Sequence, residues 1–239
     1  MTEKFIDQFI SNSIILALRY FVLCGLFFLI FYIIFKKRLT KHKLQGTFPF
    51  RTDYQRDILY SISSTLIFGL VFSLTMTTFL PYTRVYTTID TYGYGYYWLS
   101  YLLMLAVHDT YFYWTHRLIH TKQLFKTVHL VHHKSANPSP WTSYAFHPIE
   151  ALIQALIVPI IAILFPVHKF AIILYFLFQF LHNIYGHLGF ELLPVFIRES
   201  KVGRQLNTSI IHNTHHKDVR GNYGLYFTFW DKLMGTFKK

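Results

Sequence analysis

Long apolar runs separated by short polar segments dominate the pattern along this chain. Residues 10–35 carry one charge, Arg19, which is expected to reach towards a lipid headgroup. Residues 58–80 are uncharged and end at Pro81. At about 1.5 Å per residue, both runs are long enough to cross a bilayer. The pattern therefore predicts membrane-spanning helices within residues 1–90.

Three further runs continue this pattern. Residues 92–107 are uncharged and are expected to extend into an aromatic-rich helix, while 151–167 and 170–181 predict a helical hairpin. The prolines of residues 134–148 predict a loop. Four spans fit this pattern, and so do three spans plus a re-entrant pair. We expect an all-α integral membrane protein with about four transmembrane helices and a single domain over 1–239.

Composition agrees with a membrane protein. Hydrophobic residues make up 53%, aromatic residues 20% and charged residues only 14% of the chain, against about 25% charged residues in a soluble domain. The net charge of +12 can indicate a nucleic-acid partner or positive-inside topology. Because the cations gather beside apolar runs, we favour the membrane interpretation and expect no nucleic acid partner. Cys24 is the only cysteine, which excludes an intrachain disulfide and a thiolate metal cluster.

The basic segment 36–43 predicts the cytoplasmic side of the membrane. Threading the runs alternately from there places 116–133, 182–187 and 212–216 on the cytoplasmic face. No cleavable signal peptide is expected at the N-terminus. A bacterial inner membrane is favoured, or the ER membrane in a eukaryote.

Fourteen histidines are present, and most fall into tight groups on that face. His42 and His168 are interpreted as ordinary surface or core residues. Because residues three and four apart share one face of a helix, each HxxHH box is expected to aim three imidazoles at one locus. Ten imidazoles exceed the capacity of one ion, so two ions fit the count. The grouped histidines are His116, His120, His129, His132, His133, His182, His187, His212, His215 and His216.

The ligand type narrows the metal. Neutral imidazole suits Fe, Zn, Cu or Ni, whereas Mg or Ca would need carboxylates. Asp109 shares a helical stripe with His116 and His120, where it can accept the second ring N–H of a ligand or serve as an interfacial charge. Glu150 follows His147-Pro148, and either a second-shell role or N-terminal capping fits.

These residues resemble the histidine boxes of the fatty acid hydroxylase/sterol desaturase superfamily. The similarity covers about 95–237, and residues 1–90 add only apolar spans. The boxes are His108-Asp-Thr-Tyr-Phe-Tyr-Trp-Thr-His-Arg-Leu-Ile-His120, His129-Leu-Val-His-His-Lys, Phe146-His-Pro-Ile-Glu150, His182-Asn-Ile-Tyr-Gly-His-Leu-Gly189, His212-Asn-Thr-His-His216 and Trp230-Asp-Lys-Leu-Met-Gly-Thr236.

The resemblance implies a di-iron centre that uses O₂ as co-substrate to hydroxylate or desaturate a C–H bond of a membrane lipid, such as a sterol or a fatty acyl chain. Zinc can replace iron on purification. The pattern carries over to nine of the grouped histidines. His182 is a further ligand candidate that matches less regularly, because it is turned about 140° from His187 on an ideal helix. His147 and His108 are weaker ligand candidates, and Asp109 and Glu150 are second-shell candidates.

The electrons must come from outside, because the chain has no cysteine cluster and no GxGxxG fingerprint. A ferredoxin or a cytochrome b5-type protein with its reductase is implied. Two alternatives stay open at this point. A membrane metal transporter also uses histidine clusters, but usually with ionisable groups inside its spans. A non-catalytic zinc-binding membrane protein would also accept imidazole ligands.

Overall fold

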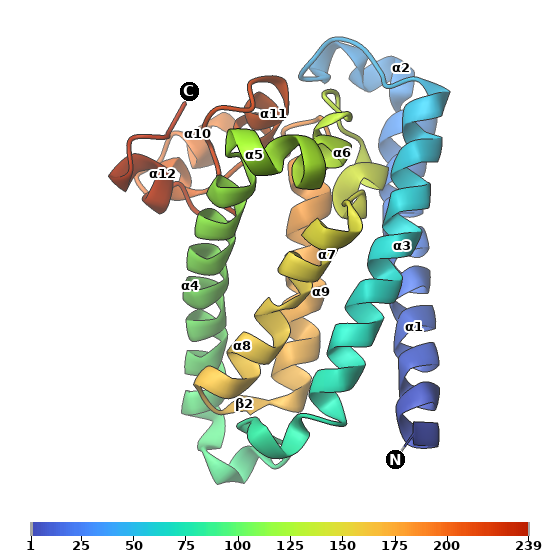
Figure 1. Ribbon diagram of the computed structural model, residues 1–239. Helices are drawn as coiled ribbons and strands as arrows, with labels where there is room; N and C mark the ends of the chain where they lie inside the picture. The colour runs from blue at the N-terminus through green and yellow to red at the C-terminus, as the bar shows by residue number, and fades with distance from the viewer. Residues whose placement is uncertain (1, 239) are drawn as a thin grey trace.

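The computed structural model describes residues 2–238 as a bundle of long helices with a cap of short helices at one end (Figure 1). The regular elements are α1 Thr2–Phe28, η1 Leu29–Ile34, α2 Lys36–Leu39, η2 Thr40–His42, α3 Arg51–Met76, η3 Leu80–Tyr82, β1 Val85–Tyr86, η4 Ile89–Thr91, α4 Gly93–Ile119, α5 Lys122–Leu124, η5 Phe125–His129, α6 Leu130–His133, η6 Pro140–Tyr144, α7 Pro148–Ala155, α8 Ile157–Leu164, β2 Val167–His168, α9 Lys169–His187, α10 Val195–Arg198, η7 Gly203–Gln205, α11 Ser209–Lys217 and α12 Phe229–Leu233.

The expected helices are present, with shifted ends. The first run forms one continuous span, Glu3–Ile34, because the π-helical turn η1 prolongs α1. Helix α3 begins at Arg51 rather than at residue 58, since the carboxylate of Asp53 accepts the N–H of Phe50 at its N-terminus. The third run forms α4, which continues through the aromatic-rich segment as predicted.

The predicted hairpin is also present, but its first arm is broken into α7 and α8. Pro159 has no N–H to donate to the carbonyl of Ala155, which explains a break at this point. The turn of the hairpin forms β2, which pairs in parallel with β1, a contact between distant segments that the sequence did not reveal. The loop expected over 134–148 contains one short 3-10 turn, η6.

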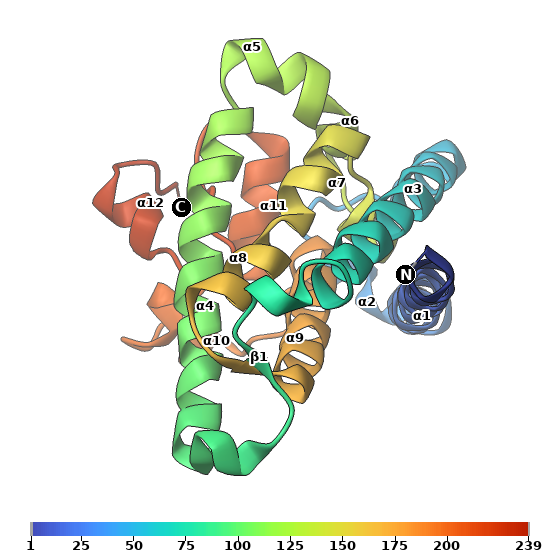
Figure 2. The ribbon, with the colours of Figure 1, turned by 60° about the horizontal axis from the view of Figure 1, so that its bottom comes forward.

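The long helices lie side by side across the bundle (Figure 2). Helix α1 packs along α3, with α4 on the opposite side and α7, α8 and α9 between them. Close approach of α1 and α3 depends on Gly69, because a Cβ there would lie 3.1 Å from the backbone Cα of Ser13.

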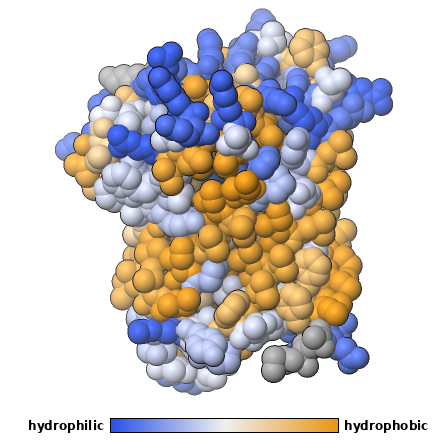
Figure 3. Space-filling view, in the orientation of Figure 1, coloured by the Kyte–Doolittle hydropathy of each residue, from blue (hydrophilic) through white to orange (hydrophobic). Residues whose placement is uncertain are grey.

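On the face shown in Figure 3, exposed apolar side chains form a belt across the bundle, between more polar surfaces at the two ends. Two helices of the described residues, Glu3–Ile34 and Arg51–Met76, are long and apolar enough to cross a membrane. The belt and these two candidate spans agree with the membrane protein expected from the sequence, whereas the predicted count of about four spans stays a prediction. Arg19 does not reach outwards as expected: its Nη2 donates to the hydroxyl of Tyr144 at 2.8 Å, inside the bundle.

Candidate metal centre

The capped end of the bundle carries the histidine boxes. His116 lies in the last turn of α4 and His120 is its C-cap, while α6 and α11 carry most of the two HxxHH boxes. His187 is the last residue of α9. Segments far apart in the sequence therefore meet at one end of the molecule (Figure 1), as alternate threading of the spans predicts.

Nine of the ten grouped histidines converge into two clusters. Within each cluster, one nitrogen from every ring lies within 4.8 Å of the others. We call them the first group and the second group. The first group is His116, His120, His129, His133 and His215. The second group is His132, His187, His212 and His216.

The spacing of the ring nitrogens fits ligands that share an ion. In the first group, Nε2 of His129 lies 3.1 Å from Nε2 of both His116 and His133. In the second group, Nε2 of His187 lies 3.2 Å from that of His132 and 3.0 Å from that of His212. Nitrogens at about 2.1 Å from one ion are roughly 3.0–3.4 Å apart in octahedral or tetrahedral geometry.

Each HxxHH box is divided between the two groups, so the expectation of one locus for each box is wrong. His129 and His133 join the first group, whereas His132 joins the second. The box on α11 divides in the opposite sense: His215 joins the first group and the other two histidines join the second. The reason is angular, since residues i+3 and i+4 lie about 100° apart on a helix, on either side of residue i.

Backbone carbonyls orient several of the rings. The Nδ1 atoms of His116, His187 and His215 lie 2.9, 2.8 and 2.7 Å from the carbonyl oxygens of Tyr223, Asn183 and Gly221. A ring that donates Nδ1–H to a carbonyl presents the lone pair of Nε2 to a metal. Sequence reasoning missed these partners, because any residue type can supply a carbonyl.

A carboxyl group lies beside the ring of His129. Its Nδ1 lies 2.7 Å from Oε1 of Glu150, and both side chains are 1% exposed. The capping position of α7 belongs to His147, whose Nδ1 accepts the N–H of Ile149. Glu150 therefore contacts a grouped histidine, and it does not cap the N-terminus of α7.

Burial keeps the grouped histidines uncharged. It lowers the pKa of His215 to about 4. Burial together with the adjacent rings lowers the pKa of His132 and of His216 well below the usual value. Neutral imidazoles can ligate a metal ion, and Nε2 of His215 and both ring nitrogens of His216 are buried without a hydrogen-bond partner. The donor set and these orphaned nitrogens fit metal ions.

Three other candidates lie outside both groups. Nε2 of His182 lies 2.9 Å from the carbonyl oxygen of Leu225, and Nδ1 of His108 lies 3.0 Å from the hydroxyl of Tyr175. Asp109 shares a stripe with His116, but its Oδ1 accepts the backbone N–H groups of Tyr226 and Phe227 instead of a ring N–H.

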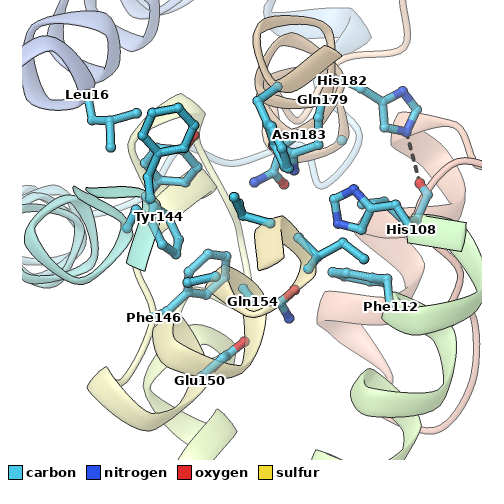
Figure 4. Close-up of a pocket in the computed structure, with 18 of the residues that line it drawn as sticks. Leu16, His108, Phe112, Tyr144, Phe146, Glu150, Gln154, Gln179, His182 and Asn183 are labelled. Atoms are coloured by element: carbon cyan, nitrogen blue, oxygen red, sulfur yellow. Dashed lines mark hydrogen bonds between the residues drawn. The ribbon is translucent and has the colours of Figure 1, made fainter. Parts of the chain in front are cut away.

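An apolar cavity of about 480 Å³ lies within the bundle (Figure 4). His116, His129, His132, His187 and His212 lie in its wall. Figure 4 shows Tyr144 and Phe146 on one side of the cavity and His108 and Phe112 on the other. Its volume is in the range of sites that enclose a small organic ligand. Other polar side chains in the wall include Asn12, Arg19, Glu150, Gln154, Lys169, Gln179, His182, Asn183 and Asn207.

Fold and site together define a helical membrane protein with a histidine-rich metal-binding site above an apolar cavity. The fatty acid hydroxylase family model matches residues 101–236, and the chain belongs to this family. The family is one of oxidoreductases, so the enzyme class expected from the sequence is confirmed, and the metal transporter and zinc protein are not favoured.

Similar proteins of known activity agree with this family assignment. Lathosterol oxidase of Homo sapiens is 29% identical over 87% of this chain and 68% of that protein. Lathosterol oxidase of Mus musculus is 29% identical over 99% of this chain and 77% of that protein. Delta(7)-sterol 5(6)-desaturase ERG3B of Gibberella zeae is 30% identical over 86% of this chain and 61% of that protein. No solved structure matches the chain.

Proposed function

We propose that this protein is an O₂-dependent hydroxylase or desaturase that uses two iron ions to oxidise a C–H bond of a membrane lipid. The observation that carries the proposal is the position of the two imidazole groups, side by side, with members of both groups in the wall of an apolar cavity. Ring centroids of His132 and His216 in the second group lie 5.7 and 5.0 Å from that of His133 in the first.

The first group would hold one ion and the second group the other. When bound and reduced, the ion pair supplies the binding and reductive activation of O₂. The protein's own contribution is to orient the rings: the carboxyl group of Glu150 lies against Nδ1 of His129, and the carbonyl oxygen of Asn183 lies 2.8 Å from Nδ1 of His187. The cavity excludes water and places the target carbon beneath the rings. His182, His108 and His147 are not among the proposed ligands.

The reaction requires external electrons. Hydroxylation puts one oxygen atom of O₂ into the C–H bond and releases the other as water, which consumes two electrons and two protons. Desaturation removes two hydrogens from the lipid and also consumes two electrons, because O₂ is then reduced to two waters. We therefore propose a separate protein electron donor, of ferredoxin or cytochrome b5 type.

The substrate class follows from likeness alone. The names of the relatives describe enzymes that act on lathosterol and on delta(7)-sterols. We propose a sterol, fatty acyl or related lipid for this chain. We also infer that the capped end faces the cytoplasm, because the basic residues of α2 lie at that end (Figure 1), and we favour a bacterial inner membrane.

The test is a comparison of lipids from cells with and without the gene, beside cells that carry His132→Ala or His215→Ala. These variants remove one ring from the second and the first group respectively. We expect a lipid that has gained one oxygen or lost two hydrogens only in cells with the unsubstituted protein. Formation of that product by either variant at the full rate would refute the proposal.

A further inference from the structure

Arg19 is the one charged side chain of α1 that lies within the bundle. Its Nη2 donates to the hydroxyl of Tyr144, and its Cζ lies 5.1 Å from the ring centroid of Phe180. These contacts join α1 to η6 and α9. An ionisable side chain at membrane depth is costly and commonly marks a functional position.

The positive charge of Arg19 is not balanced within the protein. No carboxylate of the described residues lies within ion-pair distance of its guanidinium, and its Nε is buried without a hydrogen-bond partner. A hydroxyl and a ring face replace only part of the water that a guanidinium loses on burial. Donors of the guanidinium therefore remain available for a further acceptor.

An acceptor for these donors can lie in the cavity, because Arg19 is part of its wall. Arg19 lies in the cavity wall with Leu16, and Ile15 on α1 and Ile173 on α9 line the same space while remaining 60% and 45% exposed. The cavity is thus open to the apolar belt on this side. Glu150 is the acidic residue in the wall, and its carboxylate already lies against His129.

We propose that Arg19 binds the anionic headgroup, a carboxylate or a phosphate, of the lipid that occupies this cavity. A planar guanidinium matches both headgroups because it donates parallel N–H groups to two oxygens. The inference rests on the proposed function, since the occupant is the lipid to be oxidised. It makes Arg19 a positioning residue that fixes the polar end of the lipid while the chain extends towards the histidine groups.

The test is equilibrium binding to the purified metal-loaded protein in detergent, without reductant so that no turnover occurs. The probes are stearate, stearyl phosphate and stearyl alcohol, which share one alkyl chain. We expect at least one anionic probe to bind roughly tenfold to a hundredfold more tightly than the alcohol, as a hydrogen bond between charged groups predicts. The preferred anionic probe identifies the headgroup.

Three variants separate recognition from folding. Arg19→Gln is expected to lose the preference for the anionic probe, whereas Arg19→Lys retains part of it because the charge remains. Arg38→Gln, on the exposed surface of α2, is the matched control and should keep the full preference. The inference is wrong if the unsubstituted protein binds the alcohol as tightly as both anionic probes, or if Arg19→Gln keeps the preference. Binding without lipid oxidation would instead overturn only the proposed function.

Discussion

His132 and His133 are neighbours in the chain, yet their rings belong to different imidazole groups. Nε2 of His132 lies 3.2 Å from Nε2 of His187, and Nε2 of His133 lies 3.1 Å from Nε2 of His129. The short helix α6 therefore contributes one ring to each group, His132 to the second and His133 to the first. The same division occurs on α11 between His215 and His216. Substitution of all three histidines of one HxxHH box would remove rings from both groups. Substitution of two histidines of the same group removes rings from that group alone.

The double variant His129→Ala/His133→Ala removes two rings from the first group and none from the second. We expect about two metal ions in the unsubstituted chain and about one in this variant, because the second group keeps all four rings. Metal-to-protein ratios after reconstitution with ferrous iron measure this. His182→Ala is the control and should keep both ions. Loss of all metal from the double variant would contradict two separately liganded ions.

Glu150→Gln removes the carboxyl group beside Nδ1 of His129 while preserving the size of the side chain. Loss of such a partner typically lowers metal affinity or activity by about tenfold to a hundredfold. We expect a loss of that size in lipid oxidation or in iron affinity, measured on purified protein. Glu199→Gln changes an exposed carboxylate and should leave both unchanged. If Glu150→Gln left lipid oxidation and iron affinity unchanged, as expected for Glu199→Gln, the contact with His129 would not contribute to either.

Asp109 contacts the C-terminal segment rather than the imidazole groups. Its Oδ1 accepts the N–H groups of Tyr226 and Phe227, so Asp109→Ala leaves two N–H donors without a partner. We expect a loss of about 2–5 kcal/mol of stability, seen as a lower melting temperature and faster proteolysis after residue 220. Asp109→Asn keeps an acceptor oxygen and should lose less. Equal losses in the two variants would argue against this role.

Lys43 should make stability depend on pH. Burial lowers the pKa of its ammonium from 10.5 to about 8. Between these values the unfolded chain holds a proton that the folded chain has released, so the free energy of unfolding rises with pH across this window. The gain is at most about 3 kcal/mol.

Lys43→Met tests this dependence because it removes the titrating group. Its melting temperature relative to the unsubstituted protein should be highest near neutral pH and should fall as the pH rises towards about 10. Lys37→Met, at an exposed position of α2, should show no such trend. A difference for Lys43→Met that did not change with pH would show that the buried lysine stays charged.

Gly69 and Gly95 form a matched pair for helix packing. A Cβ at Gly69 meets the backbone of Ser13 at 3.1 Å, whereas one at Gly95 meets nothing within 4 Å. We expect Gly69→Ala to lower stability by about 1–3 kcal/mol through overpacking. Gly95→Ala should be neutral or slightly stabilising, because alanine favours the helix. Melting temperatures of the two variants test this, and a stabilising Gly69→Ala would show that α1 can move away from α3.

Much of the helical framework was predictable because it depends on local chemistry. Apolar length indicated α1, α3 and α4, and proline positions indicated the loop before α7. Helix ends were less predictable, since they depend on single contacts such as the capping of α3 by Asp53. The pairing of β1 with β2 joins segments about 80 residues apart, and a two-residue strand carries no pattern of its own.

The sequence by itself determined that apolar helices bring histidine boxes to one end of a membrane protein, because hydropathy and the HxxHH spacing are local properties. Tertiary structure alone decided which ring joins which group, since that depends on the angles at which α4, α6, α9 and α11 meet. It also assigned Glu150, and not Asp109, to a grouped histidine. Finally, only the tertiary structure shows that Arg19 lies in the wall of the cavity instead of reaching towards a lipid headgroup, because the hydroxyl of Tyr144 accepts its hydrogen bond inside the bundle.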